Sequence, residues 1–284
     1  MRLRVVISIV LLVTLGQGCA RTTHNYTDPL GPRYAGGPGV MSASASQPAT
    51  LRVVTFNLEY ASAIDSAISL LQSEPALSEA DLLLLQEMDD SGTRRIADAL
   101  GLNYIYYPAT LHPVPHHDFG NAILSRWPLR DDRKIILPHH GWMRGTQRVA
   151  VTAVMMVGDL PVQVYSVHLA MMTEATGAQR RAQARTILED ASRAPGPVII
   201  GGDLNSNGVG EVFSRAGMLW PTRLEPPTKT KWFRFDHLFF RGLGAPELIR
   251  TGVVADSHGA SDHRPVWAVA NLSPASSLSE AAAP

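Results

Sequence analysis

Two polar residues stand at the end of an apolar segment in the second half of the chain. In VIIGGDLN (198–205), two glycines follow the apolar run, and Asp203 and Asn205 come after them, one residue apart. Because side chains along a strand alternate between its faces, this spacing places a carboxylate and a carboxamide on the same side of a strand end. A charged acceptor and a neutral hydrogen-bond donor that lie side by side can act together on one reacting group. The segment is therefore a candidate for part of a catalytic site.

The same arrangement recurs along the chain. Any one such residue could be a turn former or a packed side chain, since Asn and Asp are common in turns. Strands that are far apart in sequence can end at one edge of a sheet, where functional groups of α/β proteins gather. We therefore expect one polar site built from strand ends, with the further members Asn57, Glu87, Asn121, His168, Asp236, Asp262 and His263.

Strand and helix patterns alternate through the part of the chain that must position these residues. Apolar, β-branched runs predict strands at 51–58, 80–88, 120–125, 148–157, 161–169, 197–205, 235–240 and 264–272. Helical periodicity predicts helices at 63–74, 91–100 and 176–192. Helices interleave with strands early, and strand pairs follow one another in the middle. This order predicts an α/β fold in which two packed mixed β-sheets are flanked by helices, a four-layer α/β sandwich.

The N-terminal residues have the features of an export signal. Residues 1–19 combine a basic start, an apolar run from Val5 to Leu15 and small residues after it, which is typical of a secretory signal peptide. Cys19, the only cysteine, stands where such a signal is cut and resembles the lipid-accepting cysteine of a bacterial lipoprotein. The alternative is a plain signal peptide whose cysteine is discarded. In both cases we expect an exported protein, either in the cell envelope (outer membrane or periplasm) or secreted.

The rest of the chain divides into a tether, one domain and a tail. Residues 20–50 are rich in Gly, Pro, Ser, Thr and Ala and predict a flexible tether. Residues 51–272 predict one folded domain, and residues 273–284 a disordered tail. Lys plus Arg and Asp plus Glu both number 25, so the net charge neither requires nor excludes a polyanionic partner. We expect a monomer without an obligate protein partner.

The strand-end motifs together are similar to those of a known superfamily. The sequence from about Arg52 to Val269 resembles the endonuclease/exonuclease/phosphatase superfamily, which includes deoxyribonuclease I-like nucleases and neutral sphingomyelinases. The resemblance implies a deoxyribonuclease I-like fold and metal-dependent hydrolysis of phosphodiesters. GGDLN and GASDHRPV are its most specific pieces, and LQE stands upstream of both. The segments that carry it are FN, LQE, GNAILSR, VHL, GDLN, DHLF and SDHRPV.

The resemblance also implies a metal site. In its pattern Glu87, Asn57 and Asp262 hold the ion, with Asn57 in the inner or the outer shell. Carboxylates supplemented by water are the ligands that Mg²⁺ prefers, and Mn²⁺ is an alternative. The histidine pairs at 116–117 and 139–140 are read as loop residues, because a zinc site needs more ligands at fixed spacing.

The catalytic roles follow from the same resemblance. Asp203 orients the attacking water or accepts its proton, and Asn205 donates a hydrogen bond to the phosphate. Asp236 fixes the tautomer of His263, which contacts the phosphate or takes a proton. His168 matches a position where related nucleases and sphingomyelinases carry a histidine proposed to protonate the leaving group.

Two further residues are expected near the substrate phosphate. Asn121 holds the phosphate or supports the floor of the site. Arg148 reaches a substrate phosphate, or is an ordinary solvated arginine at the start of a strand. The basic, aromatic loop at 229–234 is either an ordinary exposed loop or a contact for a base or a lipid surface.

The substrate class stays open at this level. A nuclease-like hydrolase of the cell envelope is the first hypothesis, acting on a nucleic-acid phosphodiester. The alternatives within the same chemistry are a phospholipid or sphingomyelin phosphodiesterase, acting on a lipid headgroup, and a phosphomonoesterase. A non-catalytic binding module on the same fold is the hypothesis from a different class.

Overall fold

The computed structural model describes residues 24–38, 48–112, 117–243 and 249–272. The predicted signal peptide with Cys19 and the predicted C-terminal tail lie outside these ranges. Within them, every helix is too short or too polar to cross a lipid bilayer.

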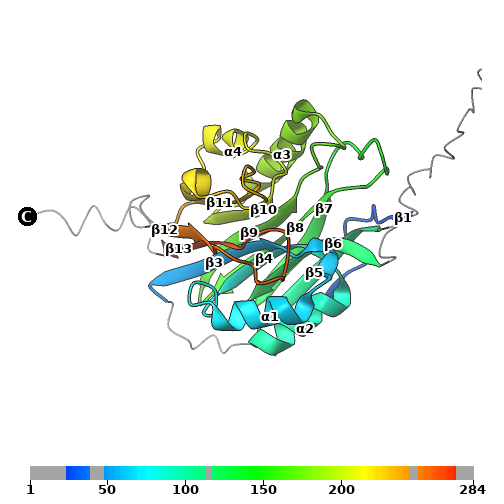
Figure 1. Cartoon of the computed structure of the whole chain (residues 1–284). Helices are drawn as coiled ribbons and strands as arrows, with labels where there is room; N and C mark the ends of the chain where they lie inside the picture. The colour runs from blue at the N-terminus through cyan, green and yellow to red at the C-terminus, as the bar shows by residue number, and fades with distance from the viewer. Residues whose placement is uncertain (1–23, 39–47, 113–116, 244–248, 273–284) are drawn as a thin grey trace, which may run out of the picture.

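Figure 1 shows two β-sheets that pack face to face between two layers of helices. The first sheet has the strand order β1-β5-β6-β4-β3-β13-β12, and β2 also pairs with β5. Its strands are β1 (His24–Asn25), β2 (Tyr34–Gly36), β3 (Thr50–Asn57), β4 (Leu82–Met88), β5 (Asn103–Leu111), β6 (Asp118–Ser125), β12 (Arg250–Val253) and β13 (Val266–Asn271).

The second sheet has the order β11-β10-β9-β8-β7. Its strands are β7 (Leu129–Ile136), β8 (Val149–Val157), β9 (Leu160–His168), β10 (Val198–Asp203) and β11 (Asp236–Arg241). The helices are α1 (Ile64–Ser73), α2 (Asp90–Leu100), α3 (Gly177–Ala191) and α4 (Glu211–Arg215), with short 3-10 turns at Glu59–Ala61 and Pro221–Leu224.

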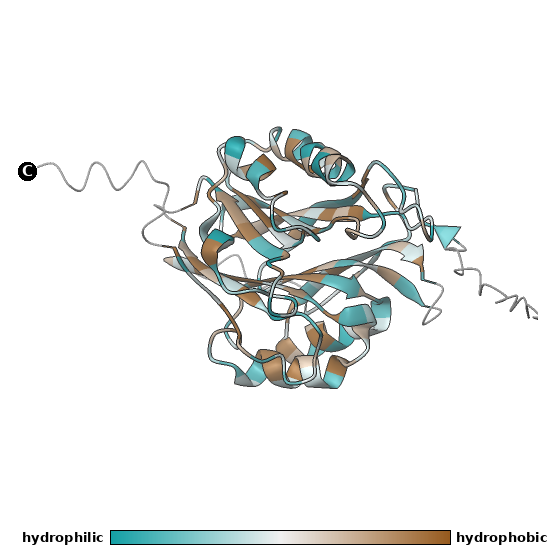
Figure 2. Ribbon diagram, turned by 45° about the horizontal axis from the view of Figure 1, so that its top comes forward, coloured by the Kyte–Doolittle hydropathy of each residue, from teal (hydrophilic) through white to brown (hydrophobic). Residues whose placement is uncertain are grey.

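Three apolar clusters hold the four layers together. The largest lies between the sheets and includes Leu84 and Ile199, and Figure 2 shows hydrophobic residues along both facing sheets. A second cluster packs α1 and α2 against the first sheet through residues such as Ile96. A third packs α3 and α4 against the second sheet through residues such as Ile187 and Phe213. Helices therefore cover the outer face of each sheet, while apolar side chains fill the space between the sheets.

Local signals set the ends of the longer helices. α3 begins at a capping box in which the Thr176 side chain and the Gln179 side chain satisfy each other's backbone N–H groups. α2 begins after Asp89, whose carboxylate accepts the Gly92 N–H, and it ends at Gly101 in the left-handed conformation that glycine favours. These signals agree with the helical periodicity and place each helix on its sheet.

The predicted four-layer α/β sandwich is confirmed. Each of the eight predicted strands and three predicted helices is present within two residues of its expected ends. The elements that the sequence analysis did not predict are β1, β2, β5, β7, β12, α4 and the two 3-10 turns. β5 contains Pro108, which lies at a bulge in its pairing with β6, and β7 is a charged strand at the edge of its sheet. Neither has the apolar alternation of a typical strand.

The predicted tether over residues 20–50 is wrong for part of its length. His24–Asn25 and Tyr34–Gly36 form β1 and β2, and both strands pair with β5. Tyr26 also donates its hydroxyl hydrogen bond to Asp118 at 2.7 Å. These short strands obtain their hydrogen bonds from an existing sheet edge, so a Gly- and Pro-rich composition does not prevent their pairing.

Candidate active site

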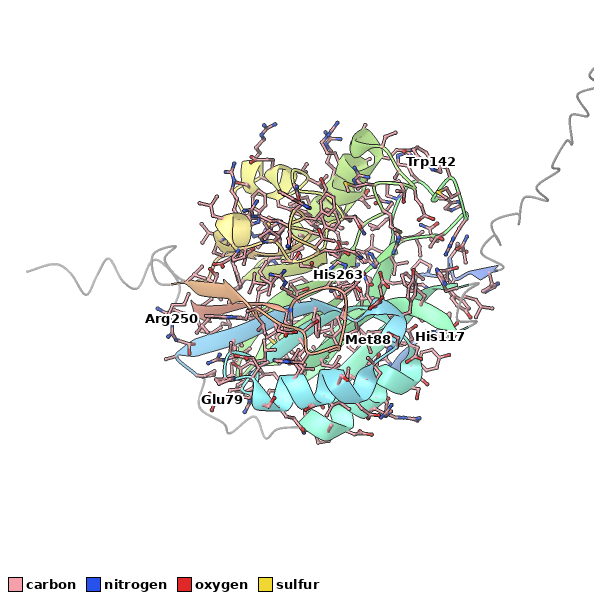
Figure 3. All side chains as sticks on the ribbon, in the orientation of Figure 1. Glu79, Met88, His117, Trp142, Arg250 and His263 are labelled. Carbon is pink, nitrogen blue, oxygen red and sulfur yellow. The ribbon has the colours of Figure 1, made fainter. Side chains whose placement is uncertain are left out.

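Three neighbouring strands of the second sheet present polar residues at one end. β9 and β10 run parallel with His168 opposite Asp203, and β11 places Asp236 opposite Asp203 on the other side. In the first sheet, β3 and β4 are also parallel and end together near Asn57. The two parallel pairs end at the same edge of the sandwich, where Asn57 bonds to Asp203. His263 lies near the centre of the view in Figure 3.

The turn after β10 fixes Asp203 in one orientation. A Cβ atom on Gly202 would lie 1.9 Å from the Val167 carbonyl oxygen, so only glycine fits this close approach of two strands. Asn205 has a φ of 46°, a left-handed conformation that asparagine tolerates. Its backbone N–H donates to Asp203 Oδ1 at 2.7 Å, and its side-chain amide donates to the Leu169 carbonyl at 3.0 Å. The GGDLN segment thus specifies the geometry of its own carboxylate.

A bulge in β4 directs Glu87 toward Asp203. The register of β4 against β6 shifts at this point, and Glu87 has a φ of 59°. The side-chain amide of Asn57 donates to Glu87 Oε1 and to Asp203 Oδ2, both at 3.0 Å. The Tyr60 N–H donates to Glu87 Oε2 at 3.1 Å, and Asn57 Oδ1 accepts the Glu59 N–H at 3.0 Å. Asn57 therefore holds two carboxylates side by side, with its own oxygen turned to the backbone.

Two sets of carboxylates could hold a hard divalent cation. Glu87 is a carboxylate ligand of the kind that Mg²⁺ prefers, supplemented by water, and it shares the Asn57 amide with Asp203. Ligand atoms of Asp203, Asp236 and His263 lie within 4.8 Å of one another. In that second group, however, Asp236 already bonds to His263, so Glu87 is the better candidate ligand.

His263 and Asp236 form a buried pair. His263 Nδ1 donates to Asp236 Oδ2 at 2.8 Å. Burial would lower the pKa of His263, but the carboxylates of Asp236 and Asp203 outweigh it and raise this pKa to about 9. Burial would raise the pKa of Asp236, but the positive charge and hydrogen bond of His263 outweigh burial and lower it. At neutral pH the pair is therefore an imidazolium beside a carboxylate.

Lys229 adds a second cation at this end of the site. Its ammonium nitrogen lies 2.9 Å from Asp262 Oδ2 and 3.0 Å from His263 Nε2. The second contact is a hydrogen bond only while Nε2 is unprotonated, so Lys229 opposes protonation of His263 and bonds to Asp262 alone once protonation occurs. The Asp262 side chain is 44% exposed and lies 3.7 Å from His263 Nε2. Asp262 therefore lies at the rim of the site, next to a lysine that would compete with a metal ion for it.

His168 has the opposite surroundings. Arg148 Nη1 lies 3.0 Å from its Nδ1 and 3.1 Å from its Nε2, and the imidazole is buried. Burial, followed by the charge of Arg148, lowers the pKa of His168 well below its usual value. His168 is therefore a neutral imidazole at neutral pH, and a neutral imidazole does not hold a proton in reserve for a leaving group.

Asp203 lies between the two histidines. Its Oδ2 is 3.6 Å from His168 Nε2 and 3.7 Å from His263 Nε2. Burial, with the nearby charge of Asp236, raises the pKa of Asp203 to about 6, although His263 and the hydrogen bonds to Asp203 act against this rise. A carboxylate with a pKa near neutrality suits proton transfer at neutral pH.

The structure brings the predicted strand-end residues together. It also distinguishes the alternative roles that the sequence left open for Asn121 and Arg148. The Asn121 side-chain amide donates to the Val149 carbonyl at 3.0 Å and to the Ser166 carbonyl at 3.1 Å. It joins the two sheets beneath the site and has no N–H left for a phosphate, so it belongs to the floor. Arg148 is only 4% exposed and contacts His168, so it is not a solvated surface arginine.

Sequence reasoning missed three contributors. Lys229 was considered only as part of a basic loop, while Tyr60 and Glu174 were not considered. Glu174 is buried, and its Oε2 lies 3.9 Å from Arg148 Nη2. Tyr60 and Glu87 lie in elements that are distant in sequence, so no periodic pattern indicates that they are neighbours. Glu174 lies in an irregular loop between β9 and α3, which has no such pattern either.

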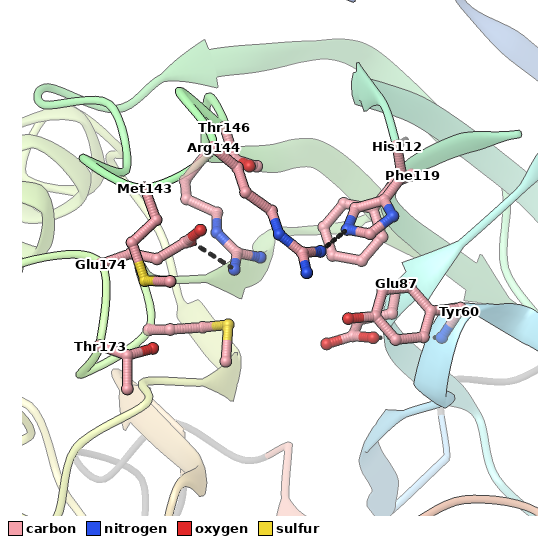
Figure 4. A pocket seen from close by; sticks show the side chains of 11 residues that line it. Tyr60, Glu87, His112, Phe119, Met143, Arg144, Thr146, Thr173 and Glu174 are labelled. Carbon is pink, nitrogen blue, oxygen red and sulfur yellow. Dashed lines mark hydrogen bonds and ion pairs between the residues drawn. The ribbon is translucent and has the colours of Figure 1, made fainter. Parts of the chain in front are cut away.

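A small pocket of about 140 Å³ opens beside Glu87 (Figure 4). Figure 4 shows the rings of Tyr60, His112 and Phe119 on one side of the pocket and Met143 and Glu174 on the other. The lining residues are Tyr60, Glu87, His112, Phe119, Met143, Arg144, Thr146, Arg148, Met171, Thr173 and Glu174.

Comparisons with known proteins concern the family and the fold. The sequence model of the Endonuclease/Exonuclease/phosphatase family matches residues 54–263, which contain every strand-end residue named above. A search of curated proteins finds no match. Among solved structures, a humanized D. rerio TDP2 with 14 mutations is 18% identical, with a TM-score of 0.60 over 79% of this chain and 100% of that chain.

Two other structures have a similar likeness. The human Nocturnin catalytic domain with bound sulfate is 20% identical, with a TM-score of 0.59 over 79% of this chain and 95% of that chain. An endonuclease/exonuclease/phosphatase from Beutenbergia cavernae is 20% identical, with a TM-score of 0.60 over 79% of this chain and 72% of that chain. At such identities the likeness concerns the fold, and it matches the two packed sheets described above.

Proposed function

The chain belongs to the endonuclease/exonuclease/phosphatase family, and from this premise we propose that it is a Mg²⁺-dependent, nuclease-like phosphodiester hydrolase, with Mn²⁺ as an alternative ion. One observation carries the proposal. Glu87, Asp203 and the His263–Asp236 pair, from four separate strands or loops, converge on one buried polar edge with carboxylates in two different charge environments. Phosphodiester hydrolysis needs such a set, namely a cation site, a proton acceptor and a positively charged donor for the phosphate.

The chain's own groups divide these tasks. Asp203, with its pKa near neutrality, accepts the proton of the attacking water. His263, held as an imidazolium by Asp236, donates a hydrogen bond to a phosphoryl oxygen whose charge grows in the transition state. Asn205 offers its second amide N–H to the same phosphate, since its first bonds to Leu169. When bound at Glu87, the divalent ion supplies Lewis-acid stabilisation of the phosphate and the leaving oxygen.

A second candidate is a phospholipid phosphodiesterase. Trp142, Met143, Met171 and Met172 are between 40% and 61% exposed, and two of them line the pocket beside Glu87. The Trp142 N–H donates to the Glu174 carbonyl at 3.2 Å, so the two loops that carry these side chains lie together. Exposed apolar side chains next to a catalytic site are also what a lipid surface would contact.

The test compares substrates and metal conditions. The purified protein is incubated with plasmid DNA, RNA, sphingomyelin vesicles and bis-p-nitrophenyl phosphate, with Mg²⁺, with Mn²⁺ or with EDTA, and p-nitrophenyl phosphate reports phosphomonoesterase activity. We expect cleavage of nucleic acid that EDTA abolishes. Glu87→Gln should abolish most of it, whereas Glu189→Gln, at a carboxylate 74% exposed on α3, should keep it. Cleavage that persists in EDTA would contradict the metal requirement, and cleavage of none of these substrates would support the binding module instead.

We further propose export to the cell envelope and lipidation of Cys19. The sequence pattern of residues 1–19 supports this, because the single cysteine stands at the end of an apolar signal-like segment. Labelling of expressing bacteria with palmitate tests it. Wild type should incorporate the label and Cys19→Ser should not, and an unlabelled wild type would end the idea.

A further inference from the structure

We infer that the pocket beside Glu87 binds a nucleobase of the substrate, on one side of the scissile phosphate. The inference rests on the proposed function and names its substrate class. The pocket shares Glu87 with the catalytic edge, and Phe119 in its wall lies 5.7 Å from the ring of His168. A group attached to the reacting phosphate can therefore reach the pocket directly.

The two walls fit a flat ring. Tyr60, His112 and Phe119 form a cluster of rings whose centroids lie 4.8 to 5.7 Å apart. Met143 lies on the opposite side of the opening in Figure 4, Met171 also lines the pocket, and both are partly exposed. Aromatic faces stack on bases, and thioethers contact ring edges favourably. A planar group between these walls would be in contact on both faces.

The end of the pocket is polar and charged. Arg148 is buried with its guanidinium 5.3 Å from the Phe119 ring, and its Nε has no hydrogen-bond partner in the described part of the chain. Glu174 is 6% exposed and lies 3.9 Å from Arg148, which is longer than a direct hydrogen bond. Burial of two charges without close pairing is costly unless a further group completes their hydrogen bonds. A base edge, with N–H donors for the carboxylate and acceptors for the guanidinium, is such a group.

The hydrogen-bonding groups of the pocket distinguish a base from a lipid. An acyl chain has no donor or acceptor to offer Arg148 Nε or the Glu174 carboxylate. Two guanidinium groups (Arg144 and Arg148) and two carboxylates (Glu87 and Glu174) line the pocket, so its charges balance. A choline headgroup has no N–H donor and no acceptor, so it could bond to none of these groups, whereas a heteroaromatic base offers both donors and acceptors beside the rings. The pocket therefore favours a nucleotide over a phosphocholine lipid.

The experiment uses dinucleotides from which one base has been removed. Hydrolysis of a dinucleotide is compared with that of two analogues, abasic on the 5′ side or on the 3′ side of the scissile phosphate. We expect kcat/KM to fall roughly tenfold to hundredfold for one of the two analogues, as expected for a lost stacking contact. Met143→Ala should reduce this ratio several-fold, and Glu174→Gln should change the order of preference among the four bases. Leu224→Ala, at a side chain 87% exposed elsewhere, should keep the wild-type ratio.

Two results would overturn the inference. Equal kcat/KM for the dinucleotide and both abasic analogues would show that no base is bound, and faster cleavage of a phosphocholine diester than of every dinucleotide would assign the pocket to a lipid headgroup. Failure of the proposed function is separate, since it would appear as no cleavage of any diester. In that case, binding of 5′-mononucleotides is compared with binding of ribose 5-phosphate by calorimetry. At least tenfold tighter binding of a mononucleotide supports the pocket, and a smaller difference or no binding rejects it.

Discussion

Two buried histidines flank Asp203 at nearly the same distance, yet their surroundings give them opposite charge states. His263 Nε2 lies 3.7 Å and His168 Nε2 lies 3.6 Å from the same carboxylate oxygen. The difference comes from the next neighbour. Asp236 contacts His263 at 2.8 Å and helps to raise its pKa, whereas Arg148 contacts His168 at 3.0 Å and helps burial to lower its pKa. One site thus holds a charged donor and a neutral imidazole side by side.

This comparison revises the roles that the resemblance suggested. A neutral His168 is poorly suited to protonate a leaving group, and a protonated His263 is unsuited to take a proton. This supports our proposal that Asp203, whose pKa is raised to about 6, is the proton acceptor of the set. Pairs of titratable groups with diverging pKa values are a common way to divide acid and base tasks.

The largest expected effect comes from removal of the carboxylate that charges His263. Asp236→Asn should lower the pKa of His263 and reduce kcat with Mg²⁺ by roughly 10³- to 10⁴-fold, because loss of an orienting carboxylate disables the histidine. NMR titration of the imidazole and initial rates between pH 5 and 9 measure both effects. The matched control is Asp190→Asn, which changes a carboxylate of α3 that is hydrogen-bonded to Tyr165 and Arg133. An unchanged pKa of His263 in Asp236→Asn would remove the basis of the comparison.

The second prediction concerns the pH dependence of stability, measured as the free energy of unfolding in urea. The folded pKa of His263 is raised to about 9, so its contribution is fully present below its unfolded pKa and is lost as pH rises toward 9. The advantage of wild type over His263→Gln should therefore shrink by up to about 3 kcal/mol between pH 6 and 9. The folded pKa of His168 is lowered, so the advantage of wild type over His168→Gln should shrink as pH falls below 6.5. Parallel curves for the two variants would contradict the opposite charge states.

The sequence predicted the strand-end residues around Asp203 better than the cations that contact the two histidines. The residues at strand ends, including Asp203 and Asp236, were predicted because apolar strands with period-two patterns place them at one edge, and the family motifs assign them roles. The fold was predicted for the same reason, since its central strands are apolar and regular. The contacts of the neighbouring cations were not predicted. Arg148 was not expected beside His168, and Lys229 reaches His263 from a loop, where a lone charged residue carries no periodicity that reports its neighbours.

The third prediction tests the other side. Arg148→Gln should let the pKa of His168 rise toward its usual value, although burial keeps it below that value. It should also reduce kcat/KM by roughly tenfold to hundredfold, because a buried cation near the phosphate and the pocket is lost. Arg148→Lys keeps the charge and should keep the pKa of His168 low. If Gln and Lys at this position gave the same imidazole titration, burial alone would explain His168.

The smallest expected effect concerns the floor that both sides share. Asn121 donates to a carbonyl of β8 and to a carbonyl of β9 beneath the site, so it supports Arg148 and His168 only through the backbone. Asn121→Ala leaves two buried carbonyl groups unpaired and should lower the free energy of unfolding by about 1–2 kcal/mol. Because its amide contacts neither histidine, the difference between their pKa values should persist in the folded variant. Urea unfolding and imidazole titration of the same sample measure both quantities. A collapse of the pKa difference in Asn121→Ala would mean that the alignment of the two sheets, rather than Asp236 and Arg148, sets the two charge states.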